Sequence, residues 1–232
     1  MKRNTAATAP LSGNRSFAAG MNFYKLFWVF FWGCFAGVVV ETIWCLLTRH
    51  TFESRLGVIY GPFNPVYGFG ALLLTVCLRR LSGRRDLWIF LGSAILGGGF
   101  EFLCSLFQEL AFGTVSWEYS HTQLNLAGRT NMMFSFFWGI LGLLWVKDIY
   151  PLLSRKIERI PDKIGRPLTW VLAVFMVLNM AISALAVGRQ SQRRSGIPPQ
   201  TAFAQFLDNT YPDKLLEVIY PNMVVVEDAI GK

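Results

Sequence analysis

Residues 55–73 read RLGVIYGPFNPVYGFGALL, and we interpret the rest of the chain around this stretch. It contains four glycines and two prolines within nineteen residues. Glycine adopts backbone angles that are closed to other residues, and proline fixes φ and lacks an N–H donor, so the stretch opposes a regular helix. It nevertheless leads directly into the apolar residues 71–77. Because irregular backbone at membrane depth is tolerated only where protein buries it or where it lines a wet cavity, we predict that it forms the wall of a functional site.

The composition is that of an integral membrane protein. Of the 232 residues, 53% are hydrophobic and only 16% are charged, which differs from an ordinary soluble domain. The chain is therefore predicted to be an all-α polytopic membrane protein with a mobile leader (residues 1–21), a five-helix transmembrane domain (22–187) and a short, helical, amphipathic tail (188–232). The five predicted spans, of which the second is broken by glycine and proline, are residues 23–47, 65–78, 87–112, 131–145 and 168–187.

The net charge of +8 is interpreted as an orientation signal. With a cytoplasmic N-terminus, fourteen of the 22 Lys and Arg residues lie in the first 25 residues, in the 79–85 turn and in the 147–166 loop. An excess of Lys and Arg on the cytoplasmic side sets the orientation of membrane proteins. We therefore predict a multi-pass protein of the bacterial inner membrane whose C-terminus lies outside. No basic face interleaved with aromatic residues accompanies the charge, so nucleic acid is not a predicted partner.

The cysteines and histidines do not predict a metal site or a cofactor. All four cysteines fall inside apolar runs and form no CxxC pair, so they are interpreted as small buried hydrophobic residues. His50 and His121 are isolated in sequence.

Two carboxylates inside the predicted spans are the sharpest functional signal. Glu41 and Glu101 each follow a glycine by four residues. A charge in the bilayer is costly, so each carboxylate should face the bundle interior or a water path and should have a partner. Arg55 and Arg129, in the loops that follow, are the predicted partners. This pattern fits either a structural ion pair that fastens the helices or a site for a proton, a cation or a polar substrate.

Other polar and aromatic side chains are predicted to converge on the same side of the membrane. Within this set, Asn125 and Arg129 directly precede a predicted span, where Asn125 can cap the helix and Arg129 can clamp an anionic group through two hydrogen bonds. A Glu-bearing helix, a loop ending near an Arg and a returning helix occur twice, which indicates either a parallel internal repeat or chance similarity between apolar helices. The predicted substrate-binding residues are Glu41, Arg55, Tyr60, Asn64, Tyr67, Glu101, Gln108, Glu109, Tyr119, Asn125 and Arg129.

Three segments carry a resemblance to a known family. They are GVIYGPFNPVYGFGALL (57–73), WEYSHTQLNLAGR followed by SFFWGILGL (117–129 and 135–143), and FLDNTYPDKLLEVIYPNM (206–223). In order and spacing they resemble the bacterial membrane family described as putative ABC-transporter type IV permeases (CmpB-like). The resemblance implies a permease component of a transporter, and it carries over no catalytic residues.

The predicted function is therefore a transporter permease component for a polar solute or ion, with a polar site in the outer half of the bilayer. The chain has no G-x-x-x-x-G-K-[ST] phosphate loop, so ATP hydrolysis would require a separate subunit, and the 147–166 loop is the candidate docking surface for it. That loop is otherwise an amphipathic surface helix, and a homo-oligomer is compatible with the sequence. Two alternatives stay open: a non-catalytic regulatory or interaction protein, and an outer-leaflet enzyme for which no nucleophile–base spacing is recognisable.

Overall fold

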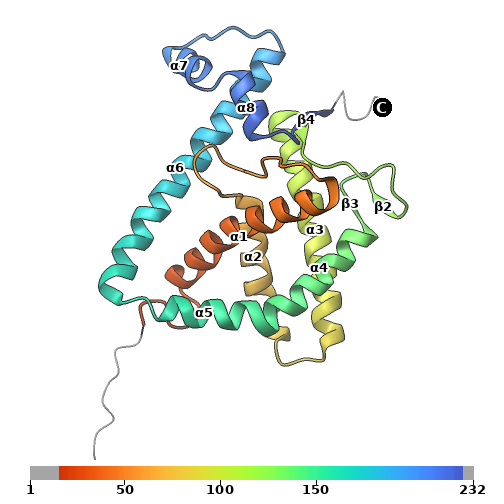
Figure 1. Cartoon of the computed structure of the whole chain (residues 1–232), viewed down its shortest axis with the longest axis vertical. Helices are drawn as coiled ribbons and strands as arrows, with labels where there is room; N and C mark the ends of the chain where they lie inside the picture. Colours follow the sequence, from red (N-terminus) through yellow and green to blue (C-terminus); the bar gives the residue numbers. More distant parts are fainter. Residues whose placement is uncertain (1–15, 227–232) are drawn as a thin grey trace, which may run out of the picture.

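The computed structural model describes residues 16–226 and consists mostly of helices (Figure 1). Within these residues, four helical segments are long and apolar enough to cross a membrane, which confirms a helical membrane protein: Phe23–Thr48, Asp86–Phe112, Met132–Glu158 and Asp162–Arg194. The predicted count of five is not confirmed, nor is the predicted break by glycine and proline in the second span, since residues 65–78 form one continuous helix. The second predicted span forms α2 (Pro65–Leu78), whose 14 residues extend only ~21 Å at about 1.5 Å per residue, less than the ~30 Å hydrocarbon core.

The first helical hairpin consists of α1 (Phe23–Arg49) and α2. The two helices approach closely at Gly37, where a Cβ atom would overlap the Tyr67 ring. One turn earlier in α1, a Cβ at Gly33 would crowd Ala71. Small residues at a helix interface permit such an approach of two backbones.

The second hairpin has the same construction. A short 3₁₀ turn, η1 (Arg79–Leu81), leads into α3 (Asp86–Phe112), which packs against α4 (Met132–Leu144). A Cβ at Gly97 would overlap Trp138 of α4. Each hairpin therefore closes on a glycine that precedes an intramembrane glutamate by four residues.

Asparagine side chains cap the N-termini of three helices, α1, α2 and α4. An N-cap side-chain oxygen satisfies an N–H group that has no partner inside the helix. The Oδ1 atoms of Asn22, Asn64 and Asn131 accept from backbone N–H groups in the first turns of α1, α2 and α4, at 2.9, 3.1 and 2.8 Å. The loop-to-helix junctions are thus fixed by local sequence.

The predicted 147–166 loop is helical and continues α4. A π-helical turn, η2 (Trp145–Ile149), joins α4 to α5 (Tyr150–Glu158), and the combined segment bends along the lower edge of Figure 1. The fully buried Lys25 of α1 forms an ion pair with Glu158 and donates to the Ser154 carbonyl at 3.4 Å. A basic residue interpreted as an orientation signal therefore also fastens α5 to α1.

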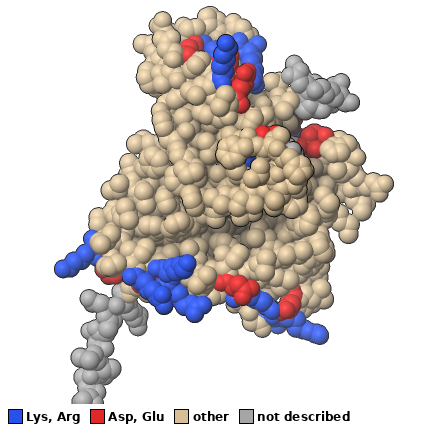
Figure 2. All heavy atoms as spheres, in the orientation of Figure 1, with Lys and Arg blue, Asp and Glu red and all other residues tan. Residues whose placement is uncertain are grey.

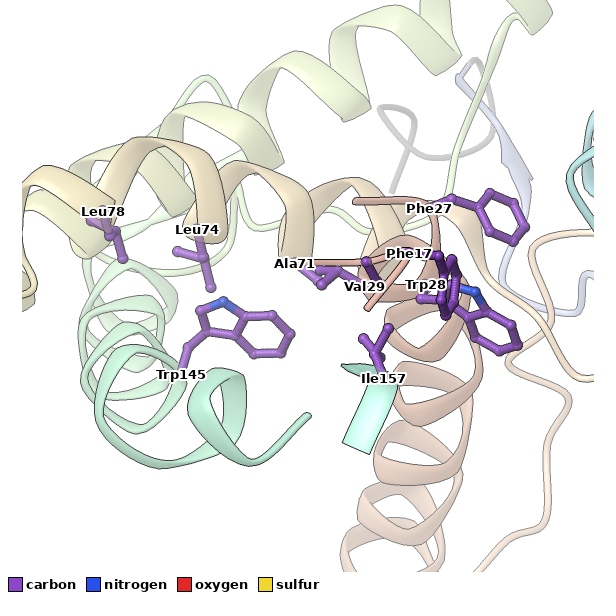
Figure 3. Close-up of a cluster of buried hydrophobic side chains, with 10 residues drawn as sticks. Phe17, Phe27, Trp28, Val29, Ala71, Leu74, Leu78, Trp145 and Ile157 are labelled. Carbon is purple, nitrogen blue, oxygen red and sulfur yellow. The ribbon is translucent and has the colours of Figure 1, made fainter. Parts of the chain in front are cut away.

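The main hydrophobic core lies at this α5 end of the molecule. Figure 3 shows Leu74 and Leu78 of α2 beside Trp145. The Trp145 Nε1 atom donates to Thr75 Oγ1 at 2.9 Å, which satisfies the only polar group of that buried indole. Residues 1–15 of the predicted leader lie outside the described residues, but the side chain of Phe17 is buried in this core, 3% exposed.

The last long helix, α6 (Asp162–Arg194), ends beyond the predicted boundary at residue 187 and leads into α7 (Ala202–Thr210) and α8 (Asp213–Ile219). Two short antiparallel pairs complete the structure. β1 (Thr114–Val115) pairs with β4 (Val224–Val225), and β2 (Asn125–Leu126) pairs with β3 (Thr130–Asn131). The tail is thereby joined to the loop that follows α3; this end of the molecule is called the tail end below.

Charged side chains concentrate at the two ends of the molecule. Figure 2 shows Lys and Arg over α5 and the α2–α3 turn at the lower edge, and over the end of α6 near α7 and α8 at the top. The band between them is almost free of charge on this face. Such a band is what a lipid bilayer requires of the helices that cross it.

Candidate functional site

The irregular residues 50–64 are held in place by polar side chains of α6. Asn179 accepts from the Tyr60 N–H at 3.1 Å and donates to the Tyr60 carbonyl at 2.6 Å, and Ser183 accepts from the Ile59 N–H at 2.9 Å. Asn179 and Ser183 are 2% and 4% exposed. They supply the hydrogen bonds that a helix would otherwise provide, so the backbone can stay irregular inside an apolar bundle.

Neither residue is among the predicted site residues, because the apolar run 168–187 contains no charged side chain. A signal was present. Asn179 and Ser183 are four residues apart, so they share one face of an otherwise apolar helix.

Arg55 is the centre of a polar cluster beside α1. Its Nη1 atom lies 3.5 Å from Glu41 Oε1, and its Nη2 atom lies 2.9 Å from Glu53 and 3.2 Å from Cys45 Sγ. The Tyr67 hydroxyl donates to the other oxygen of Glu41. The Arg55 side chain is only 8% exposed. The predicted pairing of Arg55 with Glu41 is therefore present in the structure.

A cavity of about 440 Å³ adjoins this cluster. Its walls come from α1, the irregular segment, the first turns of α2, the last turns of α3, and α6, and tail residues 220–223 lie over it. The cavity lies toward the tail end of the molecule, in the range of volumes that small-molecule sites occupy. Five of the predicted site residues line it: Glu41, Arg55, Asn64, Tyr67 and Gln108.

The other six predicted site residues do not line this cavity. Tyr60 contacts the tail, where its hydroxyl lies 2.9 Å from the Tyr211 hydroxyl. The remaining five lie in and around the α3–α4 connection: Glu101, Glu109, Tyr119, Asn125 and Arg129.

Arg129 pairs with Glu109 rather than with Glu101, which corrects the predicted pairing. Its Nη1 atom also contacts Ser105 Oγ at 3.2 Å. Glu109 is two turns farther along α3 than Glu101, at the end where the loop delivers Arg129. The Arg129 guanidinium therefore pairs with Glu109, and other side chains donate the hydrogen bonds that Glu101 accepts.

Glu101 accepts hydrogen bonds from two hydroxyl groups, Tyr119 at 3.0 Å and Thr130 Oγ1 at 2.8 Å. The Tyr119 ring stacks on Phe134 of α4 with 4.8 Å between ring centroids. Burial, and after it the charges of Glu101 and Glu41, raises the pKa of Tyr119 well above its usual value. Tyr119 is thus a neutral donor at neutral pH and lies within the electrostatic reach of both intramembrane glutamates.

Asn125 shapes the loop and does not cap a helix. Its Oδ1 atom accepts from the Gly128 N–H at 3.0 Å, and its Nδ2 atom donates to the Thr122 carbonyl at 2.7 Å. Gly128 has a φ of +68°, which favours glycine. The cap of α4 is Asn131. The predicted capping role therefore belongs to a different asparagine six residues later.

Within residues 16–226, no group of three or more His, Cys, Asp or Glu side chains is arranged to hold a metal ion. The chemistry that the cavity residues can provide is hydrogen bonding and charge: one guanidinium, one carboxylate, amides and hydroxyls. These groups suit binding and positioning of a solute.

Apolar helices that can cross a bilayer, with a cavity between them, define the class of polytopic membrane proteins. A family model described as "Putative ABC-transporter type IV" matches residues 28–184, and the chain belongs to this family. The match spans α1 to most of α6 and includes every predicted site residue. The family and the apolar helices together indicate a membrane transporter component. Neither the curated proteins nor the solved structures contain a match to this chain.

Proposed function

We propose that this chain is the permease component of a transporter and that its substrate binds in the 440 Å³ cavity. The Arg55–Glu41 pair carries the proposal. Two ionisable side chains, one of them nearly buried, lie at a cavity wall formed by irregular backbone. Intramembrane ionisable residues are costly and mark substrate or ion pathways. Transporters place their sites where broken helices meet a cavity.

We infer that α2 and the irregular residues 50–64 together make a fifth, broken crossing. Asn179 and Ser183 support this inference because these side chains of the membrane-crossing helix α6 accept hydrogen bonds from backbone N–H groups of the irregular segment. The excess of Lys and Arg at the α5 end favours a cytoplasmic location for that end. In this orientation the cavity lies in the outer half of the bilayer, and the tail lies outside.

The substrate-facing residues of this proposal are the five that line the cavity. The α3–α4 connection is proposed to have a different role, namely to stabilise the second hairpin. This role is supported by the Glu109–Arg129 ion pair and by the two hydroxyl groups that donate to Glu101. The alternative of a non-catalytic polar cluster thus describes this part of the molecule better than the part around Arg55.

A separate ATP-binding subunit is proposed to dock on α5 and the turn before α6. Arg155, Lys156 and Arg159 are exposed there. Crosslinking in native membranes followed by affinity purification tests this surface. The double variant Arg155→Glu/Arg159→Glu should recover much less of the ATP-binding subunit than the wild-type chain. The control Arg84→Glu, in the exposed α2–α3 turn, should recover the same amount; equal recovery from all three excludes α5 as the docking surface.

A test of transport does not require the substrate to be identified first. The gene is deleted in the native cell, and spent medium, cytosol and membrane extracts are profiled by mass spectrometry. At least one solute should change its distribution, and the wild-type chain should restore it. Glu41→Gln should fail to restore it, whereas the tail variant Glu217→Gln should succeed. An unchanged profile in the deletion strain would contradict the transport role.

A further inference from the structure

We propose that the cavity binds an amphipathic molecule without net charge, which enters sideways from the surrounding lipid and places its polar head at Arg55. The inference rests on the proposed function, because it names the substrate class of the same site.

The walls of the cavity differ from one side to the other. Polar side chains lie together around the α1–α2 entry and the last turns of α3, with Arg55, Glu41 and Gln108 among them. The remaining wall is apolar and consists mainly of Phe69, Phe107, Phe112, Met180, Ala184 and Val187. A small polar solute would leave this apolar wall uncovered, whereas a molecule with a polar head and an apolar body covers both parts.

The cavity opens on the side of the helices. Phe69 of α2 and Phe107 of α3 both line it, and they are 47% and 68% exposed at the molecular surface. Exposed phenylalanines on membrane-crossing helices face lipid. An apolar chain can therefore pass between the bilayer and the cavity without crossing water.

The end of the cavity toward the tail is covered. Residues 220–223 contribute to its lining, and the segment is fixed on both sides. Ser54 Oγ donates to the Ile219 carbonyl at 2.7 Å, and β4 pairs with β1. This roof hinders entry from the aqueous side and leaves the lateral opening as the shorter path.

Arg55 offers one hydrogen-bond donor to a ligand. Its Nη atoms contact Glu41, Glu53 and Cys45, but its buried Nε atom has no hydrogen-bond partner among the described residues. A buried donor without an acceptor is costly, so an acceptor oxygen of a bound molecule would stabilise it. A hydroxyl, ester or phosphoryl oxygen has this chemistry.

The groups around Arg55 favour a head without net charge. The guanidinium already faces two carboxylates, Glu41 and Glu53. An anionic head would be repelled by these carboxylates, and a cationic head such as trimethylammonium has no acceptor atom for the Arg55 Nε–H. A head group without net charge that carries an acceptor oxygen avoids both penalties.

Photolabelling of the purified chain in lipid nanodiscs tests this assignment. Four probes carry the same diazirine-bearing acyl or alkyl chain with different heads: monoacylglycerol, lysophosphatidylethanolamine, fatty acid and alkyltrimethylammonium. Labelled peptides are mapped by mass spectrometry. We expect at least one of the two net-neutral probes to label the peptides around Phe69 and Phe107 at least threefold more than either charged probe, and the better of the two identifies a hydroxyl or a phosphoryl head.

Variants on α6 show whether the label reports the cavity. Val187→Trp fills the cavity and should reduce labelling at least fivefold. Ala184→Phe, at an exposed lining position, serves the same purpose if the buried substitution prevents folding. The control Val177→Trp lies on the same helix, is 59% exposed and does not line the cavity, so labelling should stay within twofold of wild type.

Equal labelling by all four probes that neither filling variant reduces would mean annular lipid and would overturn the proposal. Preferential labelling by a charged probe would overturn the assignment of the head to Arg55. Failure of transport is distinguishable from these results. Cavity-specific labelling without any transported solute removes the transport function and keeps the site, whereas transport of a water-soluble solute without labelling does the reverse.

Discussion

The α1–α2 hairpin and the α3–α4 hairpin contain the same polar elements and use them differently. In each, a glutamate follows the close-packing glycine by four residues, and four residues later a small polar side chain contacts the loop arginine: Cys45 to Arg55 at 3.2 Å and Ser105 to Arg129 at 3.2 Å. An asparagine then caps the returning helix. Around Arg55 these groups border a cavity, and the Arg55 Nε donor has no hydrogen-bond partner among the described residues. Around Arg129 the corresponding groups contact one another, through the ion pair with Glu109 and the contact with Ser105.

This difference shows that a polar pattern inside a membrane protein does not by itself specify binding. The α3–α4 connection forms a compact hairpin, β2–β3, that brings its own hydroxyl groups to Glu101. The α1–α2 connection is irregular and depends on α6 for its hydrogen bonds, which leaves room for a cavity. We therefore expect the first hairpin to bind the substrate and the second hairpin to stabilise the packing of α3 against α4.

Bulky substitutions at Gly37 and at Gly97 should destabilise the two hairpins to a similar extent. Gly37→Leu and Gly97→Leu would drive a side chain into Tyr67 and Trp138, and each should lower the free energy of unfolding by about 3 kcal/mol or more. Thermal unfolding in detergent, followed by size-exclusion chromatography, measures the loss. Gly99→Leu, at a position with open space, is the control and should unfold like wild type. A tolerant Gly97→Leu would contradict the close approach of the second hairpin.

Arg129 should matter for stability more than for transport. Arg129→Gln leaves Glu109 without its ion pair, which should cost about 1–3 kcal/mol in unfolding free energy. The double variant Arg129→Gln/Glu109→Gln should be less destabilised than the sum of the two single variants, since neither charge is left alone. Strictly additive losses would show that the two side chains are not coupled. The exposed Arg159→Gln serves as the control.

Substitution of Glu41 should impair transport much more than substitution of Glu101. Glu41→Gln removes the charge at the cavity wall and should lower restoration of the transported solute at least tenfold, about 1.4 kcal/mol in free energy. Glu101→Gln keeps an acceptor oxygen for one of the two hydroxyl donors, and its NH2 group can donate to the oxygen of the other hydroxyl, so it should stay within about twofold of wild type. Both proteins should elute as folded species. The reverse ranking of the two variants would transfer the binding role to the second hairpin.

The packing of α7 against the end of α6 should loosen in acid. Hydrogen bonds from Arg189, together with Arg193, hold the pKa of Asp208 below its usual value. A carboxyl group whose folded pKa is lowered stabilises the structure above its unfolded pKa of about 4 and loses this effect as the pH falls through the folded value. Screening by water limits the contribution to about 1 kcal/mol or less.

Amide hydrogen exchange of α7, corrected for the intrinsic rate, measures this loosening. Opening should increase below about pH 4 in the wild-type chain. Asp208→Asn should show the increased opening at neutral pH and little further change in acid. An Asp208→Asn variant that keeps the wild-type pH dependence would mean that another group controls the tail.

The sequence predicted the elements of this protein better than their partners. Apolar runs and glycine–glutamate spacings depend on neighbours within one or two helical turns, so residues 23–47 and 87–112 were placed within two residues of α1 and α3 at each end. The partner of Arg129 was predicted wrongly because it depends on the depth at which a loop enters. Asn179 and Ser183 were missed for the same reason, since their partners lie about 120 residues away in the chain.

By itself the sequence determined that this is a helical membrane protein, that its intramembrane carboxylates need partners, and that the glycines and proline of residues 55–64 interrupt regular structure before α2 begins. These properties follow from the transfer of side chains out of water and from backbone angles, which are local quantities. Only the tertiary structure decided which charges meet and where a cavity remains. Those outcomes depend on how helices rotate and pack against one another, and no stretch of the chain contains that information alone.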